Sequence, residues 1–542
     1  MKLDCLLIHV PKLNNYYDLF GKHMYCMFIS MGLFAIADYI NKNNYKVQIL
    51  HLGLEQISNK KFSLQEYLRE TTPKIVGLSL HWHHQSFDII EVAKAIKRIN
   101  PDTFIVLGGF TASYFHLEIM EKFTFVDAIV RGDGEIPFTD LLIRKSKNED
   151  SLFSIPNLTW RNRDGRIVKN EIKYIAKTED LDKLNFVNLK LLKNYELYIK
   201  YARDPFIWIN GVNKTINSIL LDKDGYFPLS IMRGCDVNCS FCGGSKISNM
   251  TISKRLNQVF LSVEKVVASL EDLKAYGYTS VFIDFSPLVD PRYLDNLLAK
   301  IKDRKIEIGC IAAFRSLPSK KLLSMFADTF KLNKSKIFLS PETSSETDRL
   351  LNKGYYFSNE ELLETITNST NLGIRTEIYF VLGLPFQTLQ SLKEIKNFQK
   401  LLRKRFGKRI RIYTDFLALE PGSPMYIDPD KFEIIKTRNC FMDFYYGHSG
   451  ERSHSWPDLG YYSENFLPEN VYSTNVNKDY AFKNELKKIY CKDFCKLTDF
   501  FRSSIFIGGE NSFSVNAASI LSRLLCKIVA SYWKLKEDLP AW

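Results

Sequence analysis

Residues 232–245 read Met-Arg-Gly-Cys-Asp-Val-Asn-Cys-Ser-Phe-Cys-Gly-Gly-Ser, which places Cys235, Cys239 and Cys242 within eight residues. This spacing is too tight for a disulfide framework and indicates a metal site. A structural zinc ion almost always takes four protein ligands, and no further Cys or His lies nearby in the sequence. Three thiolates suit an iron–sulfur cube that keeps one iron open. A zinc site completed by a distant residue is the alternative.

The cysteine loop lies at the start of a regular alternation of strands and helices between residues 226 and 428. The predicted strands are Phe227–Met232, Ser280–Asp284, Glu307–Phe314, Lys336–Leu339, Arg375–Leu382 and Arg411–Leu417. The predicted helices are Val259–Tyr276, Arg292–Lys302, Lys320–Phe330, Asn359–Leu372 and Leu389–Phe406. This α/β pattern favours a partial (β/α)6 barrel of the TIM type, whose active site lies at the carboxyl ends of the strands. The loop follows the first strand and is expected at that face.

The cysteine loop resembles the signature of radical S-adenosylmethionine (SAM) enzymes. The C-x3-C-x2-C spacing, with the aromatic Phe241 before the last cysteine, carries the resemblance. It implies a 4Fe-4S cluster held by Cys235, Cys239 and Cys242, with SAM bound to the open iron. It also implies an external electron donor of the flavodoxin or ferredoxin type and one-electron cleavage of SAM to methionine and a 5′-deoxyadenosyl radical.

Later segments of the predicted barrel resemble the SAM-binding strand ends of the same family; they are Ile337–Ser344, Val381–Thr388 and Leu419–Pro424. The resemblance implies SAM contacts from Phe241, Gly243, Gly244, Asp284, Ser340, Glu342, Gly383 and Pro385. Capping of βα turns is the plain structural alternative for Asp284, Ser340 and Glu342. Arg315, after the third strand, is a candidate partner of Glu342 or of the SAM carboxylate. For Arg315 a surface salt bridge is the alternative.

Residues 1–142 alternate strands and helices as in a doubly wound (Rossmann-like) parallel sheet. The predicted strands are Leu3–Val10, Tyr45–Leu50, Lys74–Leu80, Thr103–Leu107 and Asp127–Val130, and the predicted helices are Met31–Asn43 and Phe87–Ile99. The segments that resemble the cobalamin-binding domain often found ahead of a radical SAM barrel are Val76–Ser79, Val106–Thr111 and Val130–Phe138. The resemblance implies cobalamin contacts from Ser79, Gly108, Gly109, Gly132 and Glu135. Glycine would let the backbone approach the nucleotide tail closely.

The lower face of cobalamin has no obvious ligand in this sequence. Many cobalamin domains supply one from Asp-x-His-x-x-Gly after the first strand, where this chain reads His9-Val-Pro-Lys-Leu-Asn-Asn. His81, Trp82 and His83 follow the third predicted strand, where the cobalamin face is expected. Imidazole is a competent metal ligand, and Trp82 could instead cover the lower face. We therefore expect contact from this run without assigning a cobalt ligand.

Two less regular segments complete the predicted organisation. Residues 143–225 read as a linker with small elements, including a hairpin that turns at Asp164-Gly165. The radical SAM domain is predicted at 226–428. Residues 429–542 read as a mixed, mainly α C-terminal region that would cover the barrel and contact the substrate. A late helix is predicted there at Val515–Leu535.

The composition is that of an ordinary globular protein, with 45% hydrophobic and 25% charged residues. The formal net charge of +13 is spread along the chain, which indicates compositional bias rather than a nucleic-acid partner. No run reaches about 18 apolar residues and no signal-peptide pattern is present, so we expect no membrane span and a cytoplasmic location. Cys440, Cys491 and Cys495 could form another cluster, but buried structural cysteines are the plainer interpretation.

Together the resemblances imply a cobalamin-dependent radical SAM enzyme with a small-molecule or peptide substrate. In similar proteins the most common use is methylation of an unactivated carbon, with methylcobalamin as the donor and the protein aligning the cofactors. One alternative is a ring-forming, ring-contracting or rearranging enzyme without methyl transfer. Another is a non-catalytic cobalamin-binding or sensing protein. The sequence identifies no catalytic residue beyond the cluster ligands and Arg315, and no substrate.

Overall fold

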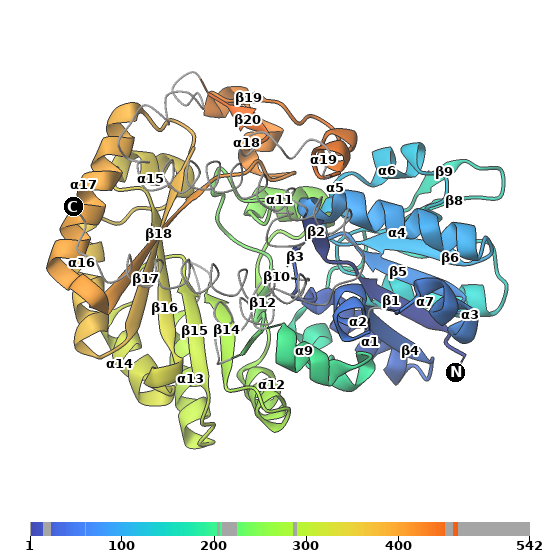
Figure 1. Ribbon diagram of the computed structural model, residues 1–542, viewed down its shortest axis with the longest axis horizontal. Coiled ribbons are helices and arrows are strands. Elements are labelled where there is room, and N and C mark those ends of the chain that lie inside the picture. Colours follow the sequence, from blue (N-terminus) through green and yellow to red (C-terminus); the bar gives the residue numbers. More distant parts are fainter. Residues whose placement is uncertain are drawn as a thin grey trace, which may run out of the picture.

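The computed structural model of the protein describes residues 2–14, 23–59, 61–202, 206–208, 225–285, 290–449 and 459–463. Two large sheets stand side by side, the N-terminal one in blue and the second in yellow and green (Figure 1). Short C-terminal elements, in orange, extend from the second sheet toward the first. Within the described ranges, no helix has the length and apolar character needed to cross a membrane.

Five parallel strands form the core of the N-terminal sheet, in the order β4-β1-β5-β6-β7. They are β1 (Cys5–His9), β4 (Val47–His51), β5 (Ile75–Ser79), β6 (Phe104–Gly108) and β7 (Ala128–Val130). The order reverses between β1 and β5, and ligands of such sheets bind outside the carboxyl ends at that point. The predicted doubly wound sheet is confirmed.

Helices cover both faces of this sheet. They are α1 (Met31–Lys42), α2 (Leu52–Ser58), α3 (Leu64–Thr71), α4 (Ser86–Ile99), α5 (Phe110–Tyr114), α6 (His116–Lys122) and α7 (Glu135–Ser146). Alternate residues of β1 enter two different cores: Leu7 packs with Phe34 of α1, and Leu6 packs with Ile89 of α4. Burial on both faces explains why the strands read as continuous apolar runs.

The predicted hairpin consists of β8 (Leu158–Arg161) and β9 (Ile167–Lys169) and turns at Asp164-Gly165 as expected. It is not an independent linker element, because β8 pairs antiparallel with β7 and extends the N-terminal sheet. The short helices after the hairpin are α8 (Thr178–Asp182), η2 (Leu189–Leu191) and α9 (Tyr195–Tyr201), and a further one, η1 (His83–Gln85), lies directly before α4. A small sheet joins β2 (Lys12–Asn14), β3 (His23–Tyr25) and β10 (Phe206–Trp208).

The second sheet contains six parallel strands in chain order and does not close on itself. The strands are β11 (Tyr226–Pro228), β14 (Ser280–Phe285), β15 (Gly309–Phe314), β16 (Lys336–Glu342), β17 (Arg375–Leu382) and β18 (Ile410–Phe416). The helices between them are α12 (Val263–Ala275), α13 (Pro291–Asp303), α14 (Lys320–Thr329), α15 (Glu346–Lys353), α16 (Asn359–Asn371) and α17 (Leu389–Phe406), with η3 (Leu332–Lys334) and η4 (Gly407–Arg409). The predicted partial barrel is confirmed.

The first barrel strand is shorter than predicted. β11 ends at Pro228, and β12 (Met232–Arg233) instead pairs antiparallel with β13 (Val259–Phe260). The helix predicted from Val259 therefore begins only at Val263, where the Ser262 hydroxyl accepts a hydrogen bond from the Lys265 amide. Such an N-cap fixes the start of a helix, and the apolar pattern before it belongs to the strand pair.

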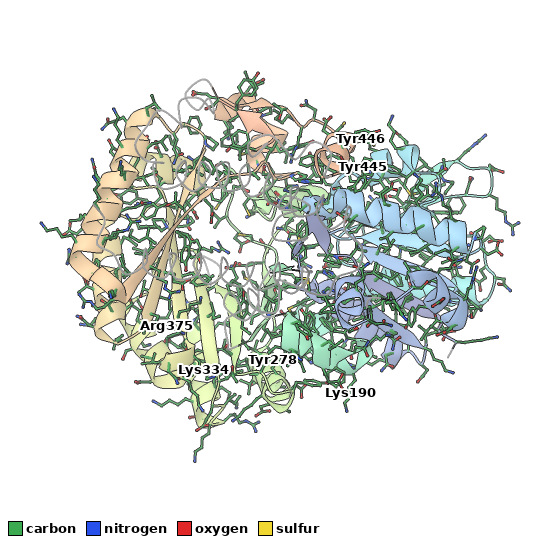
Figure 2. All side chains as sticks on the ribbon, viewed as in Figure 1. Lys190, Tyr278, Lys334, Arg375, Tyr445 and Tyr446 are labelled. Carbon is green, nitrogen blue, oxygen red and sulfur yellow. The ribbon has the colours of Figure 1, made fainter. Side chains whose placement is uncertain are left out.

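The described part of the C-terminal region bridges the two sheets. Its elements are α18 (Pro424–Ile427), η5 (Asp430–Phe432), β19 (Ile435–Lys436), α19 (Phe441–Gly447) and β20 (Tyr461–Tyr462). Tyr445 of α19 reaches the N-terminal domain, where its hydroxyl donates to Glu91 at 2.8 Å (Figure 2). The predicted helix Val515–Leu535, Cys491 and Cys495 lie outside the described residues.

Candidate active site

The cysteine loop connects β12 to α11 (Lys246–Ser253) near the carboxyl ends of the barrel strands. Cys235, Cys239 and Cys242 are free, half-buried thiols. Burial raises the pKa of Cys239 to about 11 and that of Cys242 to about 12, and neighbouring thiols add to both rises. Without a bound cation these thiols are therefore neutral. A metal group that carries positive charge would favour the thiolates, because metal binding releases thiol protons.

The thiols do not converge on one ion: across the described ranges, no three His, Cys, Asp or Glu side chains could hold a single metal ion. Zinc–sulfur bonds of about 2.3 Å would require sulfurs within about 4 Å of one another. An iron–sulfur cube instead takes each thiolate at a different iron. The arrangement of the three free cysteines thus fits a cluster better than it fits a zinc ion.

The last turn of α15 holds the cysteine loop against the barrel. Ser240 N donates to Asn352 O at 2.7 Å, and Ser240 Oγ donates to Asn352 Oδ1 at 2.5 Å. Asn352 Nδ2 in turn donates to the carbonyl of Pro385 at 2.9 Å. The Cys239 thiol donates to the carbonyl of Lys353, with 3.6 Å between the two atoms. These contacts tie the loop to the ends of β16 and β17.

Glu342 ends β16 and lies in this region. Its Oε1 accepts a hydrogen bond from Lys353 Nζ at 3.0 Å, and the same ammonium donates to the carbonyl of Ser340. Glu342 has a φ of +63°, a left-handed conformation that costs a non-glycine residue about 1–2 kcal/mol. The surrounding contacts therefore hold the carboxylate in a defined position. The structure brings both predicted residues, Ser340 and Glu342, to one strand end.

Arg315 pairs with Asp284, and the partnership with Glu342 considered from the sequence is wrong. Arg315 Nε lies 3.0 Å from Asp284 Oδ1, and Nη2 donates to Oδ2. Glu342 is already held by Lys353. The Asp284 carboxylate raises the pKa of Arg315 above its ordinary value. Both side chains remain accessible, 43% and 37% exposed, so a ligand can reach the pair.

The remaining predicted SAM contacts are mostly backbone groups. Gly383 follows β17 with a φ of +95°, and its amide donates to Gln387 Oε1 at 2.8 Å. Pro385 offers a carbonyl that Asn352 already uses. The Gly244 amide donates to Cys242 Sγ at 3.3 Å. Phe241 packs into the apolar cluster that includes Leu419, so packing explains this aromatic residue as well.

Glu420 is a site residue that sequence reasoning did not select. A Cβ on Gly243 would lie 2.9 Å from Glu420 Oε2, so the glycine permits a close approach of the two segments. Burial raises the pKa of Glu420 to about 7. Its position in Glu-Pro-Gly-Ser-Pro at the sixth strand end was visible in the sequence, but nothing local indicated that the carboxyl faces the cysteine loop.

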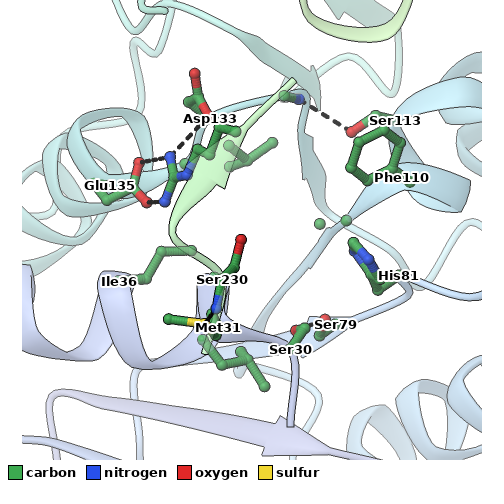
Figure 3. Close-up of a pocket in the computed structure, with 18 of the residues that line it drawn as sticks. Ser30, Met31, Ile36, Ser79, His81, Phe110, Ser113, Asp133, Glu135 and Ser230 are labelled. Atoms are coloured by element: carbon green, nitrogen blue, oxygen red, sulfur yellow. Dashed lines mark hydrogen bonds and ion pairs between the residues drawn. The ribbon is translucent and has the colours of Figure 1, made fainter. Parts of the chain in front are cut away.

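A cavity of about 520 Å³ lies between the N-terminal sheet and the segment that leads into the cysteine loop (Figure 3). The predicted cobalamin residues that line it are Ser79, His81, Trp82, Gly108, Gly109, Gly132 and Glu135. The other side contributes Met232, Arg233, Gly234 and Asp284. Gly109 has a φ of +100°, and a Cβ there would lie 2.8 Å from the backbone of His81. A mainly apolar cavity with glycine at the strand ends fits a large cofactor.

His83 does not join this group, contrary to the sequence prediction. It is 2% exposed, and its Nδ1 lies 3.1 Å from His448 Nε2, on the side of the C-terminal helix α19. The chain enters η1 at His83. That turn directs His83 away from the cavity, whereas an extended strand would have kept its side chain on the same face as His81.

His81 and Trp82 flank the cavity as predicted for this run. The two rings meet edge to face at 4.8 Å between centroids, and His81 also meets Phe110 at 5.2 Å. Burial lowers the pKa of His81 to about 4, so the imidazole is neutral and can act as a ligand. His9 is 1% exposed, and its Nε2 lies 2.7 Å from the carbonyl of Cys26, which occupies that nitrogen.

The Glu135 carboxylate is engaged by Arg233, a residue that sequence reasoning did not select. Arg233 Nη1 lies 2.8 Å from Asp133 Oδ1 and 3.2 Å from Glu135 Oε2 (Figure 3). Glu135 thus lines the cavity through a paired side chain, not a free carboxylate. The adjacency of Arg233 to the cysteine loop was a signal, but its partner lies about a hundred positions earlier and no local pattern identifies it.

Two family models match this chain. The B12-binding domain matches residues 25–142, and the radical SAM superfamily matches residues 229–398. The first range contains β4, β5, β6 and β7 of the N-terminal sheet, and the second contains the cysteine loop with four of the six barrel strands, β14 to β17. The matches are independent of the cavity geometry and agree with it.

Several proteins are similar over much of the chain. The uncharacterized methyltransferase PH0819 of Pyrococcus horikoshii is 24% identical, covering 69% of this chain and 73% of its own. The anaerobic magnesium-protoporphyrin IX monomethyl ester cyclase of Rubrivivax gelatinosus is 24% identical over 55% of this chain. The cobalamin-dependent radical SAM methyltransferase TokK of Streptomyces tokunonensis is 22% identical over 67% of it. This chain spans 49% of the length of each of the latter two.

Solved structures share the fold. The radical SAM methyltransferase TsrM of Kitasatospora setae, solved with tryptophan substrate and a SAM analogue, superposes with a TM-score of 0.58 at 17% identity. The match covers 78% of this chain and 75% of TsrM. The cobalamin-dependent SAM radical enzyme OxsB, solved with aqua-cobalamin, gives a TM-score of 0.58 at 16% identity, covering 96% of this chain and 75% of OxsB.

Proposed function

Because the chain belongs to the radical SAM enzymes that carry an N-terminal B12-binding domain, we propose that it is a cobalamin-dependent methyltransferase acting on an unactivated carbon. The observation that carries the proposal is one cavity lined by both halves of the protein. The ends of β5 and β6 form one wall, and the segment before the cysteine loop forms the other. Two cofactors held on these walls would face each other across the space for a substrate.

The cobalamin side is assigned to the ends of β5, β6 and β7. The Ser79 hydroxyl lies 2.9 Å from that of Ser30, and both residues line the cavity where a nucleotide tail would pass. Gly108 and Gly109 keep this edge open for close backbone approach. His81 and Trp82 stand at the cavity wall, where they would contact the corrin face.

The SAM side is assigned to the cysteine loop and the barrel strand ends. Cys235, Cys239 and Cys242 would hold the cluster, whose chemistry when bound is one-electron cleavage of SAM. The accessible Asp284–Arg315 pair carries both charges needed by the amino and carboxylate groups of SAM. Glu342 is fixed by Lys353, so its carboxylate is oriented before any ligand arrives.

The names of several relatives support methyl transfer over the alternatives. PH0819, TokK and TsrM are all named as methyltransferases. The magnesium-protoporphyrin cyclase represents the ring-forming alternative, and it matches this chain over 49% of its own length. An external flavodoxin or ferredoxin type donor and a small-molecule or peptide substrate complete the proposal. A cytoplasmic location suits the reduced thiols that the loop requires.

The test uses purified holoenzyme reconstituted anaerobically with iron, sulfide and hydroxocobalamin. It is reduced and incubated with SAM that carries a trideuterated methyl group. We expect an absorption spectrum with both cluster and corrin bands, 5′-deoxyadenosine, and methylcobalamin heavier by the labelled methyl in mass spectrometry. Unlabelled cobalamin beside abundant deoxyadenosine would eliminate methyl transfer and favour the ring-forming alternative.

Matched cysteine variants separate the cluster from general damage. Cys239→Ala removes a proposed cluster ligand and should abolish deoxyadenosine formation. Cys440→Ala removes a thiol that is half-buried near α19 and contacts Asp443, far along the chain from the loop. It should leave deoxyadenosine formation within about twofold of the parent, because surface-proximal substitutions of this kind have small effects.

A further inference from the structure

Two arginines flank the cysteine-loop segment and bind one loop of the N-terminal domain. Arg233 precedes the loop and makes a forked contact with Glu135, with 2.5 Å between Nη2 and Oε1. Arg255 follows α11, and its Nη2 lies 2.5 Å from Asp133 Oδ2. Arg233 also reaches Asp133, at 2.8 Å. Both ends of the segment that carries the cysteines are thus fastened to residues 133–135.

These charges are removed from water. The side chain of Glu135 is 2% exposed, that of Arg255 4%, that of Asp133 10% and that of Arg233 21%. Buried charges are tolerated only when they are paired with good geometry. A forked guanidinium–carboxylate contact fixes an angle as well as a distance. The network therefore constrains how the two segments are oriented.

Two glycines allow close packing around the network. A Cβ on Gly132 would lie 2.7 Å from the Cβ of Ser253 at the end of α11. A Cβ on Gly234 would lie 2.6 Å from Cδ of Arg255. Glycine at 132 lets the N-terminal loop touch the end of α11 directly, and glycine at 234 leaves room for the Arg255 side chain. All the flanking residues, from Gly132 through Glu135 and from Met232 through Gly234, line the cavity.

We propose that the pairs of Arg233 and Arg255 with Asp133 and Glu135 set the distance and orientation between the cysteine cluster and the cobalamin-facing cavity. They are positioning residues: none of the four needs to touch a reacting atom. The inference rests on the proposed function, since it concerns how two cofactors are aligned for methyl transfer. A purely stabilising role would lower the folding stability without altering that alignment.

Arg233→Met is the main test, because methionine keeps an apolar stem of similar length and removes the fork. Holoenzyme loaded with iron, sulfide and hydroxocobalamin is reduced so that the cluster and cob(II)alamin are both paramagnetic. Electron–electron dipolar spectroscopy then reports their separation. We expect one narrow distance distribution for the parent protein and a distribution at least twofold wider for Arg233→Met. Arg233→Lys keeps the charge without the fork, and the width of its distance distribution should lie between those of the parent and Arg233→Met.

A matched control removes an ion pair of similar burial within the N-terminal region. Lys193 Nζ lies 2.5 Å from Glu55 Oε2, with side chains 26% and 3% exposed. Lys193→Met should leave the distance distribution unchanged even if it lowers the melting temperature as much as Arg233→Met does. An equal width for Arg233→Met and the parent, or equal broadening in Lys193→Met, would overturn the proposal.

A second variant covers the case in which Arg233→Met does not fold. Arg233→Met/Glu135→Leu removes both charges of the fork, so Glu135 is not left as an unpaired buried carboxylate, and Asp133 still pairs with Arg255. Its distance distribution should still be at least twofold wider than that of the parent. A parent-like distribution in the folded double variant would contradict the positioning role.

A kinetic measurement separates this inference from the proposed function. Formation of methylcobalamin from cob(I)alamin and SAM transfers a methyl cation to cobalt, which donates the electron pair, and releases S-adenosylhomocysteine. In Arg233→Met this rate should fall at least tenfold while the Kd for SAM changes less than threefold. A parent protein that forms no methylcobalamin would defeat the proposed function, yet the distance comparison would still decide the positioning role.

Discussion

Lys353 joins the cysteine loop to the fourth barrel strand through two separate groups. Its Nζ lies 3.0 Å from Glu342 Oε1, and its backbone carbonyl accepts a hydrogen bond from the Cys239 thiol. Lys353 is 1% exposed and Glu342 is 6% exposed. A buried pair of this kind is sensitive to the loss of one partner, because the remaining charge has no solvent to stabilise it.

We predict that Lys353→Met lowers the free energy of unfolding by about 3–5 kcal/mol, the usual cost of an orphaned buried charge. Urea unfolding of the cluster-free protein measures it. Lys321→Met breaks the exposed pair with Asp295, 2.5 Å apart, and should cost less than about 1 kcal/mol. Lys353→Met/Glu342→Leu should recover most of the loss. Equal costs for Lys353→Met and Lys321→Met would contradict the buried pair.

Removing the Ser240 hydroxyl should lower cluster content more than it lowers stability. Ser240→Ala loses the 2.5 Å hydrogen bond to Asn352 Oδ1, with an expected cost of about 1–3 kcal/mol for the buried acceptor left behind. Ser262→Ala removes a helix cap outside the cysteine loop, at a cost of about 1 kcal/mol. After reconstitution, iron per chain should fall at least twofold only in Ser240→Ala. Equal iron content in both variants would show that Ser240 does not hold the loop.

Local chemistry made most of the fold predictable. The strands and helices of both sheets follow from apolar periodicity, and caps such as Ser319 and Ser358 mark helix starts within the sequence. The exceptions are also physical. The apolar pattern that begins at Val259 predicted a helix from that residue. Val259 and Phe260 instead pair antiparallel with Met232-Arg233, a contact that no local sequence rule reveals.

The sequence predicted which strand ends carry the candidate site residues, but it did not predict which side chains pair with one another there. Ser340, Glu342 and Asp284 could be placed because the carboxyl ends of parallel strands share one edge. The partner of Arg315 could not be predicted. Glu342, the expected partner, is paired with Lys353, which lies eleven positions later on α15. His83 does not line the cavity because the chain turns into η1 at this residue, which directs the side chain away from the cavity.

Acid should destabilise the N-terminal domain through buried neutral histidines. His51 is 0% exposed, its Nε2 lies 2.8 Å from the carbonyl of Met27, and burial lowers its pKa from 6.5 to about 4. Below pH 6.5 the unfolded chain takes up this proton and the folded chain does not. Stability from this group is therefore complete above pH 6.5 and falls as the pH drops toward 4, by about 3 kcal/mol in all at about 1.4 kcal/mol per pKa unit.

Unfolding free energies measured between pH 4 and 7.5 test this prediction. His51→Gln should reduce the slope of the unfolding free energy against pH by up to one proton between pH 6.5 and pH 4. This change in slope is expected whatever the substitution does to stability at pH 7.5. Glutamine keeps a donor for the Met27 carbonyl and cannot titrate. The same slope in His51→Gln and the parent would mean that other groups account for the acid sensitivity.

Gly109, which follows β6, offers the sharpest test of the cobalamin edge, because a second glycine in the turn between β8 and β9 provides its control. Both Gly109 and Gly165 have positive φ, +100° and +77°, but only at Gly109 would a Cβ meet other atoms, 2.8 Å from the His81 backbone. Gly165→Ala should cost about 1–2 kcal/mol from the left-handed backbone alone. Gly109→Ala should cost more and weaken hydroxocobalamin binding at least tenfold in equilibrium titration, since the new methyl displaces His81 from the cavity wall. Unchanged cobalamin affinity in a folded Gly109→Ala protein would remove this strand end from the proposed site.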